Sequence, residues 1–238
     1  SVPLAQQAGI AARLAACAKP CVWTLRMLTA LVSGAEGQPW FRLFDKVFAE
    51  RNLLAATQQV ASRKGAAGVD HVSVDEFVGQ VPETLWQLSD ALKAGTYRPQ
   101  AIRRVHIPKP GTKETRPLGI PTVRDRVVQA AVVNVIEPIF ERDFAEQSYG
   151  FRPGRGCKDA LREVDRLLKE GFTHVVDADL AGYFDSIPHE RLLERVRAHV
   201  SDARVLDLVE MFVRQDVVRG LERWSPTAGT PQGAVISP

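Results

Sequence analysis

The sequence predicts an α+β fold, and three observations support this prediction. Apolar residues recur at helical spacing in four stretches, residues 1–60, 74–92, 122–137 and 201–214. A β-favouring run at 101–108, a turn-prone segment and a returning run at 115–120 indicate a hairpin. Residues 172–180 form a short apolar run flanked by polar residues, which is typical of a buried strand.

Turn residues and caps divide the chain into these elements in order. The break at 33–39 interrupts the first helical stretch, and the Gly-rich segment 64–70 precedes a helix over 74–92 that ends near Gly95. Thr122 and Asp125 resemble a capping box that opens a helix ending before Pro138. Gly182 predicts a turn, a further helix opens near Pro188, and an amphipathic helix covers 201–214.

Composition is that of a globular chain with one large or two small domains. Hydrophobic residues make up 45% and charged residues 25% of the 238 residues. No run approaches the roughly 18 apolar residues of a membrane span, and the Ala-rich start lacks a signal-peptide pattern. We therefore expect an intracellular, cytoplasmic protein. Cys17, Cys21 and Cys157 form no Cys-x-x-Cys pair, so neither a disulfide framework nor a zinc site is indicated.

Positive charge is concentrated in one stretch. The net charge is only +3, but Arg98 to Arg116 holds six basic residues against the single acid Glu114, which leaves −2 for the rest of the chain. Such clustering is typical of a surface that meets phosphates. Lys109 and Arg116 flank the hairpin turn and can both reach a triphosphate. The alternative is a solvated strand edge protected by its charges.

Two further segments have the composition of ligand-binding loops. In residues 149–158, Tyr149 and Phe151 alternate with cations, which suits base stacking and phosphate contact, although the aromatic residues could instead anchor in the core. Residues 229–233 offer backbone N–H groups and the amide of Gln232 to a nucleotide, although the segment could equally be a connection.

Asp177 and Asp179 lie two residues apart in the predicted strand. Side chains so spaced share one face, with carbons about 6.5 to 7 Å apart. Carboxylates at the end of an apolar strand suit Mg²⁺, which takes one or two of them together with substrate phosphates. Capping of the Gly182 turn, or pairing with an arginine, explains the same residues equally well.

These segments together resemble group II intron reverse transcriptases, over residues 50–238. Seven blocks follow in the family's order: Lys-Gly-Ala-Ala-Gly-Val-Asp (64–70), Ile-Pro-Lys-Pro (107–110) through 116–122 with Asp-Arg-Val-Val-Gln (125–129), Glu-Pro-Ile-Phe-Glu (137–141), Ser-Tyr-Gly-Phe-Arg-Pro-Gly-Arg (148–155), Asp-Ala-Asp-Leu (177–180), Phe-Asp-Ser-Ile (184–187) and Gly-Thr-Pro-Gln-Gly (229–233). No single block is decisive, but seven in order make the resemblance specific.

The resemblance implies a right-hand polymerase: a helical extension over 1–40, fingers over 41–120, and a partial palm over 121–238 with a fingers insertion at about 195–225. It implies a template-directed nucleotidyl transfer with two Mg²⁺ ions, or Mn²⁺, acting on an RNA template, a DNA primer and a deoxynucleotide. The resemblance also implies intron RNA as a template or binding partner.

The resemblance also assigns roles to residues. Asp179 becomes the first metal-binding aspartate and Leu180 offers its carbonyl to the metal, while Asp177 is only a neighbour. Lys109 and Arg116 hold the triphosphate, Phe184 is the steric gate at the sugar, and Gln232 contacts the nucleotide or template. Six more cations are expected to contact nucleic acid: Arg103, Arg104, Lys113, Arg152, Arg155 and Lys158.

The sequence departs from the family at Ala181, where Lys is usual, and at Ala234, where Gly is usual. The Tyr-x-Asp-Asp turn that supplies the other metal aspartates is not among these residues, so we expect a fragment that is inactive by itself. Two alternatives are a non-catalytic RNA-binding module that acts as a splicing cofactor, and an assembly fragment that forms a homodimer through uncovered apolar surface.

Overall fold

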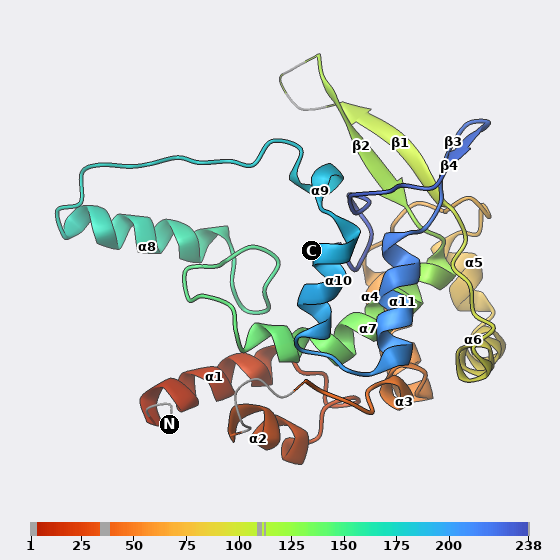
Figure 1. Ribbon diagram of the computed structural model, residues 1–238, viewed down its shortest axis with the longest axis horizontal. Coiled ribbons are helices and arrows are strands. Elements are labelled where there is room, and N and C mark those ends of the chain that lie inside the picture. The colour runs from red at the N-terminus through yellow and green to blue at the C-terminus, as the bar shows by residue number, and fades with distance from the viewer. Residues whose placement is uncertain (1–3, 34–38, 109–110, 112, 238) are drawn as a thin grey trace. The chain divides into compact units, whose positions relative to one another are not determined.

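The computed structural model describes residues 4–33, 39–108, 111 and 113–237, with side chains from residue 11 onward. The chain divides into two compact units (Figure 1). Unit 1 comprises Ser1–Glu36 and Ile136–Ala181, and unit 2 comprises Gly37–Val135 and Gly182–Pro238. Among the described residues, no helix is both long and apolar enough to cross a membrane.

The helices of unit 2 form its core. Helix α4 (Glu50–Ser62) packs near α3 (Phe44–Val47), α5 (Val74–Gly79) and α6 (Glu83–Ala94). Helix α10 (His189–Arg197) packs on α11 (Ala203–Val213), and α9 (Tyr183–Ser186) is a single turn after Gly182. The predicted helices near Pro188 and over 201–214 are confirmed.

Helix α7 (Val123–Glu141) carries the predicted apolar stripe into this core. Its buried members include Val127, Val128, Ala131, Val132 and Val135. The hydroxyl of Thr122 accepts a hydrogen bond from the backbone N–H of Asp125 at 3.1 Å, which caps the start of the helix as predicted.

Two predicted helix boundaries are wrong. The single helix expected over 74–92 is two helices, because Pro82 lacks a backbone N–H and ends the first one. Helix α6 does end at Gly95, which takes a left-handed conformation with φ 71°. The end expected before Pro138 is also wrong: α7 continues to Glu141, where burial of Ile139 and an ion pair of Glu141 stabilise the last turn.

The predicted hairpin is confirmed. Strand β1 (Ile102–Pro108) pairs antiparallel with β2 (Thr115–Ile120), in a register that sets Ile107 opposite Arg116. Sequence reasoning missed two short strands, β3 (Val217–Arg219) and β4 (Glu222–Trp224). Strand β3 adds parallel to β1, giving a four-stranded mixed sheet of order β2-β1-β3-β4 (Figure 1). Strand β2 therefore lies at an edge, as its prolines suggested.

Unit 1 contains α1 (Leu4–Cys17), α2 (Leu25–Ser33), α8 (Cys157–Lys169) and the last turns of α7. Leu14, Cys17, Trp23 and Leu31 are buried. Burial, with the nearby charges of Glu137 and Glu141, raises the pKa of the Cys17 thiol to about 12, so this cysteine is an inert core residue. All three cysteines are free.

The buried strand predicted over 172–180 is wrong. These residues form no strand and are exposed, with Val175 at 79% and Val176 at 91% exposure. A strand needs a neighbour to supply its backbone hydrogen bonds, and no described segment pairs with this one. Helix α8, by contrast, was not predicted, although Leu161, Val164 and Leu168 recur along it at helical spacing.

Candidate nucleotide and nucleic-acid site

The cationic hairpin presents part of its predicted charge to solvent. Arg116 on β2 and Lys113 before it are exposed, and neither side chain makes a hydrogen bond or ion pair within the described part of the chain. Lys109, the other predicted triphosphate contact, lies outside the described residues. The exposed guanidinium of Arg116 is free to bind a phosphate in two-point fashion.

The two arginines of β1, Arg103 and Arg104, contact other residues of unit 2. Arg103 Nη2 donates to the carbonyl of Ala67 at 2.5 Å, and the Arg104 guanidinium lies 5.4 Å from the centroid of the Trp224 ring. Both side chains are half-buried. They thus have structural partners, and Arg104 also forms with Trp224 a cationic and aromatic surface on the sheet.

The Gly-rich segment 64–70 lies against the start of α7, which sequence reasoning did not foresee. Arg126 donates from Nη2 to the carbonyl of Ala66 at 2.6 Å. A Cβ on Gly68 would lie 2.6 Å from Cα of Thr122, so only glycine fits there. Burial lowers the pKa of Arg126, partly offset by the charge of Asp70. Arg126 therefore joins the Gly-rich segment 64–70 to α7.

Residues 229–233 join two other parts of the predicted site. The backbone N–H of Thr230 donates to the carbonyl of Phe184 at 2.7 Å, and the N–H of Gly119 on β2 donates to the carbonyl of Gln232 at 2.7 Å. The structure therefore brings together, within unit 2, the Phe184 turn, the Gln232 loop and the strand that carries Arg116.

Phe184 and Gln232 both keep accessible side chains. Phe184 is half-buried and meets the Tyr183 ring edge-on, with centroids 5.7 Å apart. Gln232 is half-buried, and its side-chain amide makes no hydrogen bond with any described residue. An aromatic face and an unengaged amide beside a cationic strand suit recognition of a nucleotide's sugar and base.

The predicted metal ligands lie in unit 1. Asp177, Asp179 and Leu180 are all exposed in the segment that forms no strand. In the described part of the chain, no group of three His, Cys, Asp or Glu side chains could hold a metal ion. A single exposed carboxylate, Asp179, does not fit the requirements of a two-ion magnesium site.

The three cationic side chains of the loop at 149–158 lie in different environments. The Arg152 guanidinium is buried, donates to both carboxylate oxygens of Glu141 at 2.6 to 3.2 Å, and also donates to the carbonyls of Ala145 and Ser148. These contacts make Arg152 a structural anchor. Arg155 stacks 5.7 Å from the Tyr149 ring, whereas Lys158 is exposed.

Phe151 does not anchor the same loop. Its side chain is 81% exposed, so the alternative in which both aromatic residues anchor in the core fails for Phe151. Its backbone takes a positive φ of 55°, an uncommon conformation for a bulky residue.

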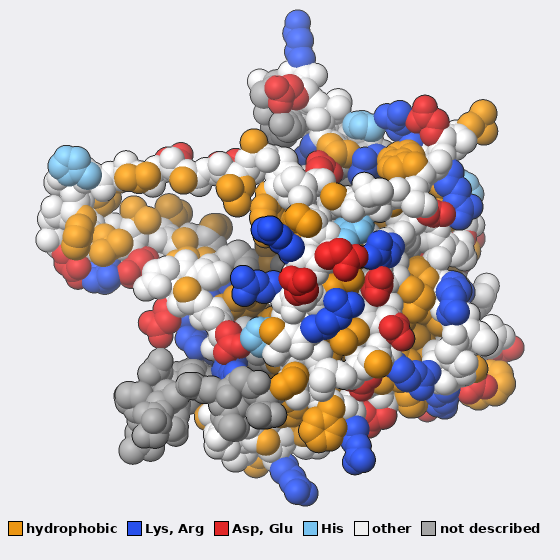
Figure 2. Space-filling model, in the orientation of Figure 1, with side chains coloured by type: hydrophobic (Ala, Val, Ile, Leu, Met, Phe, Trp, Pro, Cys, Tyr) orange, Lys and Arg blue, Asp and Glu red, His pale blue; other side chains and the backbone are white. Residues whose placement is uncertain are grey.

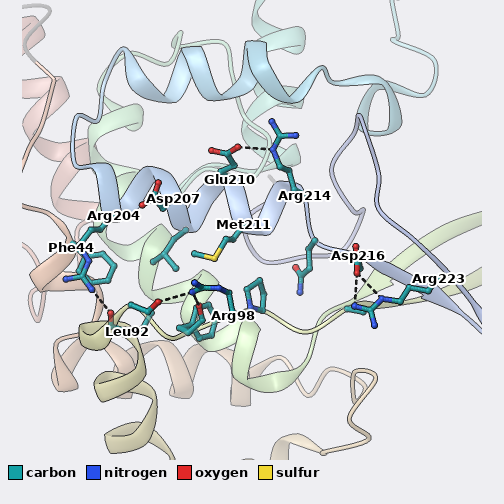
Figure 3. Close-up of a pocket in the computed structure, with 16 residues that line it drawn as sticks. Phe44, Leu92, Arg98, Arg204, Asp207, Glu210, Met211, Arg214, Asp216 and Arg223 are labelled. Carbon is teal, nitrogen blue, oxygen red and sulfur yellow. Dashed lines mark hydrogen bonds and ion pairs between the residues drawn. The ribbon is translucent and has the colours of Figure 1, made fainter.

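Unit 2 also has a hollow of about 650 Å³ lined by α6, α11 and the start of the sheet (Figure 3). Its arginines already have partners: Arg204 binds the carbonyls of Leu92 and Lys93, and Arg98 binds that of Gly95. Arg214 and Arg223 form ion pairs with Glu210 and Asp216. The hollow is therefore a less suitable phosphate site than the hairpin.

Cationic and acidic side chains are mixed over α10 and α11, as Figure 2 shows. Arg214, for example, contacts Glu190 on α10 as well as Glu210 on its own helix. Local charge is thus largely balanced on this face. The exposed charge of the hairpin is the stronger indication of a phosphate contact.

Comparison with known proteins identifies the family. Residues 107–238 match the family described as reverse transcriptase (RNA-dependent DNA polymerase). The chain is 42% identical over 193 residues to protein YkfC of Escherichia coli (strain K12), covering 78% of this chain and 50% of that protein. It is 36% identical over 197 residues to the group II intron-encoded protein LtrA of Lactococcus lactis subsp. cremoris, covering 83% of this chain and 33% of that protein.

The chain belongs to the reverse transcriptase family and contains a reverse transcriptase domain related to group II intron-encoded proteins. It spans half of YkfC and a third of LtrA. The fold agrees: a chain of a structure described as a partial Cas6-RT-Cas1--Cas2 complex aligns with a TM-score of 0.52 at 19% identity, over 82% of this chain and 32% of that one. This likeness supports the fold alone.

Proposed function

We propose that this chain is the part of a group II intron-type RNA-directed DNA polymerase that binds the incoming nucleotide and the primer–template. The observation that carries the proposal is the meeting of the Phe184 turn, the Gln232 loop and the Arg116 strand within unit 2. Arg116, with Lys109, binds the triphosphate, Phe184 lies against the sugar, and Gln232 contacts the nucleotide or the template base. The partners are an RNA template, a DNA primer and a deoxynucleotide.

The domain assignment follows from the same family. The hairpin and the helices of 41–120 are the fingers, with residues 195–225 added to them. The palm begins near Pro121, and 1–40 is a helical extension. Asp179 supplies one metal ligand of the palm, with the Leu180 carbonyl beside it.

A polypeptide of these 238 residues does not polymerise by itself. Its sequence contains no adjacent Asp pair, and one carboxylate does not hold two Mg²⁺ ions. The second candidate function, RNA binding as a splicing cofactor, is favoured by the exposed charge of Arg116 and Lys113, which needs no metal site. Template-dependent primer extension by this polypeptide, in Mg²⁺ or Mn²⁺, would refute the inactivity.

A salt titration of binding tests the role of the hairpin. We expect Arg116→Ala to weaken binding to an RNA–DNA primer–template about fivefold and to reduce the salt slope by about one, because one phosphate contact is lost. The matched control is Arg166→Ala on α8, an exposed arginine already paired with Glu163 and Glu170. Equal effects of the two substitutions would contradict the assignment.

Specific nucleotide binding separates the two candidate functions. Addition of a complementary deoxynucleotide should tighten primer–template binding if the chain is a polymerase domain, because nucleotide and template are bound together. An RNA-binding cofactor would bind structured RNA with the same steep salt dependence and would show no such response.

A further inference from the structure

We infer that two buried side chains, His189 and Gln129, are positioning residues that hold the backbone of residues 229–235 at its two ends. They leave the Gln232 amide free for a ligand. The role of Gln232 as a nucleotide contact rests on the proposed function, but the two attachments are properties of this chain's own contacts. They come from two helices, α10 and α7.

The first attachment is made by His189, the first residue of α10. Its side chain is 3% exposed, and Nε2 lies 2.7 Å from the carbonyl oxygen of Gly229. A carbonyl only accepts, so Nε2 carries the proton and donates. Nδ1 is buried and has no hydrogen-bond partner in the described part of the chain. The hydrogen bond to Gly229 is therefore the polar contact that accounts for burying this ring.

The backbone around Gly229 is closely packed on the turn of Phe184. Gly229 has φ 85°, and a Cβ there would lie 2.8 Å from the carbonyl oxygens of Phe184 and Asp185. Its own N–H donates to Ile187 at 2.8 Å, and Thr230 donates to Phe184 at 2.7 Å. The remaining polar group of Gly229 is its carbonyl, which accepts the hydrogen bond from His189. This hydrogen bond therefore helps to hold the loop against the turn of Phe184.

The second attachment is made by Gln129 in the middle of α7. The side chain is fully buried, and its Oε1 accepts a hydrogen bond from the backbone N–H of Val235 at 3.0 Å. Its Nε2 is buried without a partner among the described residues. Burying an amide is costly unless it is hydrogen-bonded, so the contact with Val235 is the structural reason for a glutamine in this apolar stripe.

Between the two attachments, the backbone of Gln232 is fixed and its side chain is not. The carbonyl of Gln232 accepts from Gly119 at 2.7 Å. A fixed backbone with an unengaged side-chain amide presents that amide in a set position, which lowers the entropy lost when a ligand binds.

Amide hydrogen exchange measured by NMR tests the inference on the 238-residue chain. The amides of Gly119, Thr230 and Val235 report on the loop, and those of α4 report on the rest of unit 2. We expect His189→Leu and Gln129→Met to speed exchange at the loop amides about tenfold relative to α4, because each removes one buried hydrogen bond.

Two controls separate positioning from general stability. His189→Gln keeps a donor that reaches Gly229, so loop exchange should return to within about threefold of the unmodified chain. Thr57→Val removes a buried hydrogen bond to Leu53 within α4 and should speed exchange in α4 without a selective effect on the loop. The Gln232 side-chain amide signal should shift in His189→Leu and recover in His189→Gln.

Unchanged loop exchange in both variants, or an equal rise at loop and α4 amides, would overturn the inference. So would a failure of His189→Gln to restore the loop. If the attachments are confirmed but saturating deoxynucleotide with primer–template leaves the Gln232 amide signal unmoved, the proposed nucleotide contact fails and the positioning role stands.

Discussion

Asp125 is a buried carboxylate that joins three segments of unit 2. It accepts hydrogen bonds from the Tyr97 hydroxyl at 2.7 Å and the Gln100 backbone N–H at 2.8 Å, and its own N–H is capped by Thr122. The cap could be predicted from the sequence, because Thr122 and Asp125 are close neighbours along the chain. The contacts with Tyr97 and Gln100 could not, since they depend on tertiary packing.

Removing this carboxylate should cost more than removing its partner's hydroxyl. We expect Asp125→Ala to lower the free energy of unfolding by about 3 kcal/mol, because it leaves buried donors unpaired, and Tyr97→Phe by about 1 kcal/mol. Urea denaturation measures both. Equal effects would show that Asp125 is not the centre of this network.

The same carboxyl gives the fold a pH dependence. Burial raises the pKa of Asp125 above 3.8, despite the opposing hydrogen bonds from Tyr97 and Gln100 and the charge of Arg124. A raised folded pKa means that its contribution to stability is complete below about pH 3.8 and is lost as pH rises through the folded value. We expect the unfolding free energy of the unmodified chain, measured relative to that of Asp125→Asn, to fall as pH rises over that range. If the difference between the two chains did not change with pH, the assignment would be contradicted.

At the scale of elements, the hairpin and the 172–180 segment show what a sequence pattern determines. The hairpin was predicted correctly because its two strands are separated by only six residues and pair with each other. The 172–180 segment has an equally clear apolar pattern, but forming a strand depends on a partner from elsewhere, and no described strand pairs with it. Its Asp179 and Leu180 keep their proposed roles on the family resemblance alone.

At the scale of the whole molecule, the order of motifs predicted the family. The motifs could not predict which segments of the site lie together, because that depends on tertiary packing. Phe184, Gln232 and Arg116 are far apart in sequence, and the backbone hydrogen bonds of residues 229–232 help to bring their segments together. Of the two positioning side chains, His189 gave no signal of its own, and Gln129 stood in the 125–129 block without an assigned role, because the sequence does not show which backbone group either side chain contacts.

Photocrosslinking tests the central claim, a single nucleotide surface in unit 2, most directly. A photoreactive deoxynucleotide, bound at saturation with a complementary RNA–DNA primer–template, should crosslink to residues 116–119, 183–184 and 229–233, as mapped by mass spectrometry. A noncomplementary template should abolish these crosslinks. Labelling confined to the hollow lined by α6 and α11, or to α8, would contradict the claim.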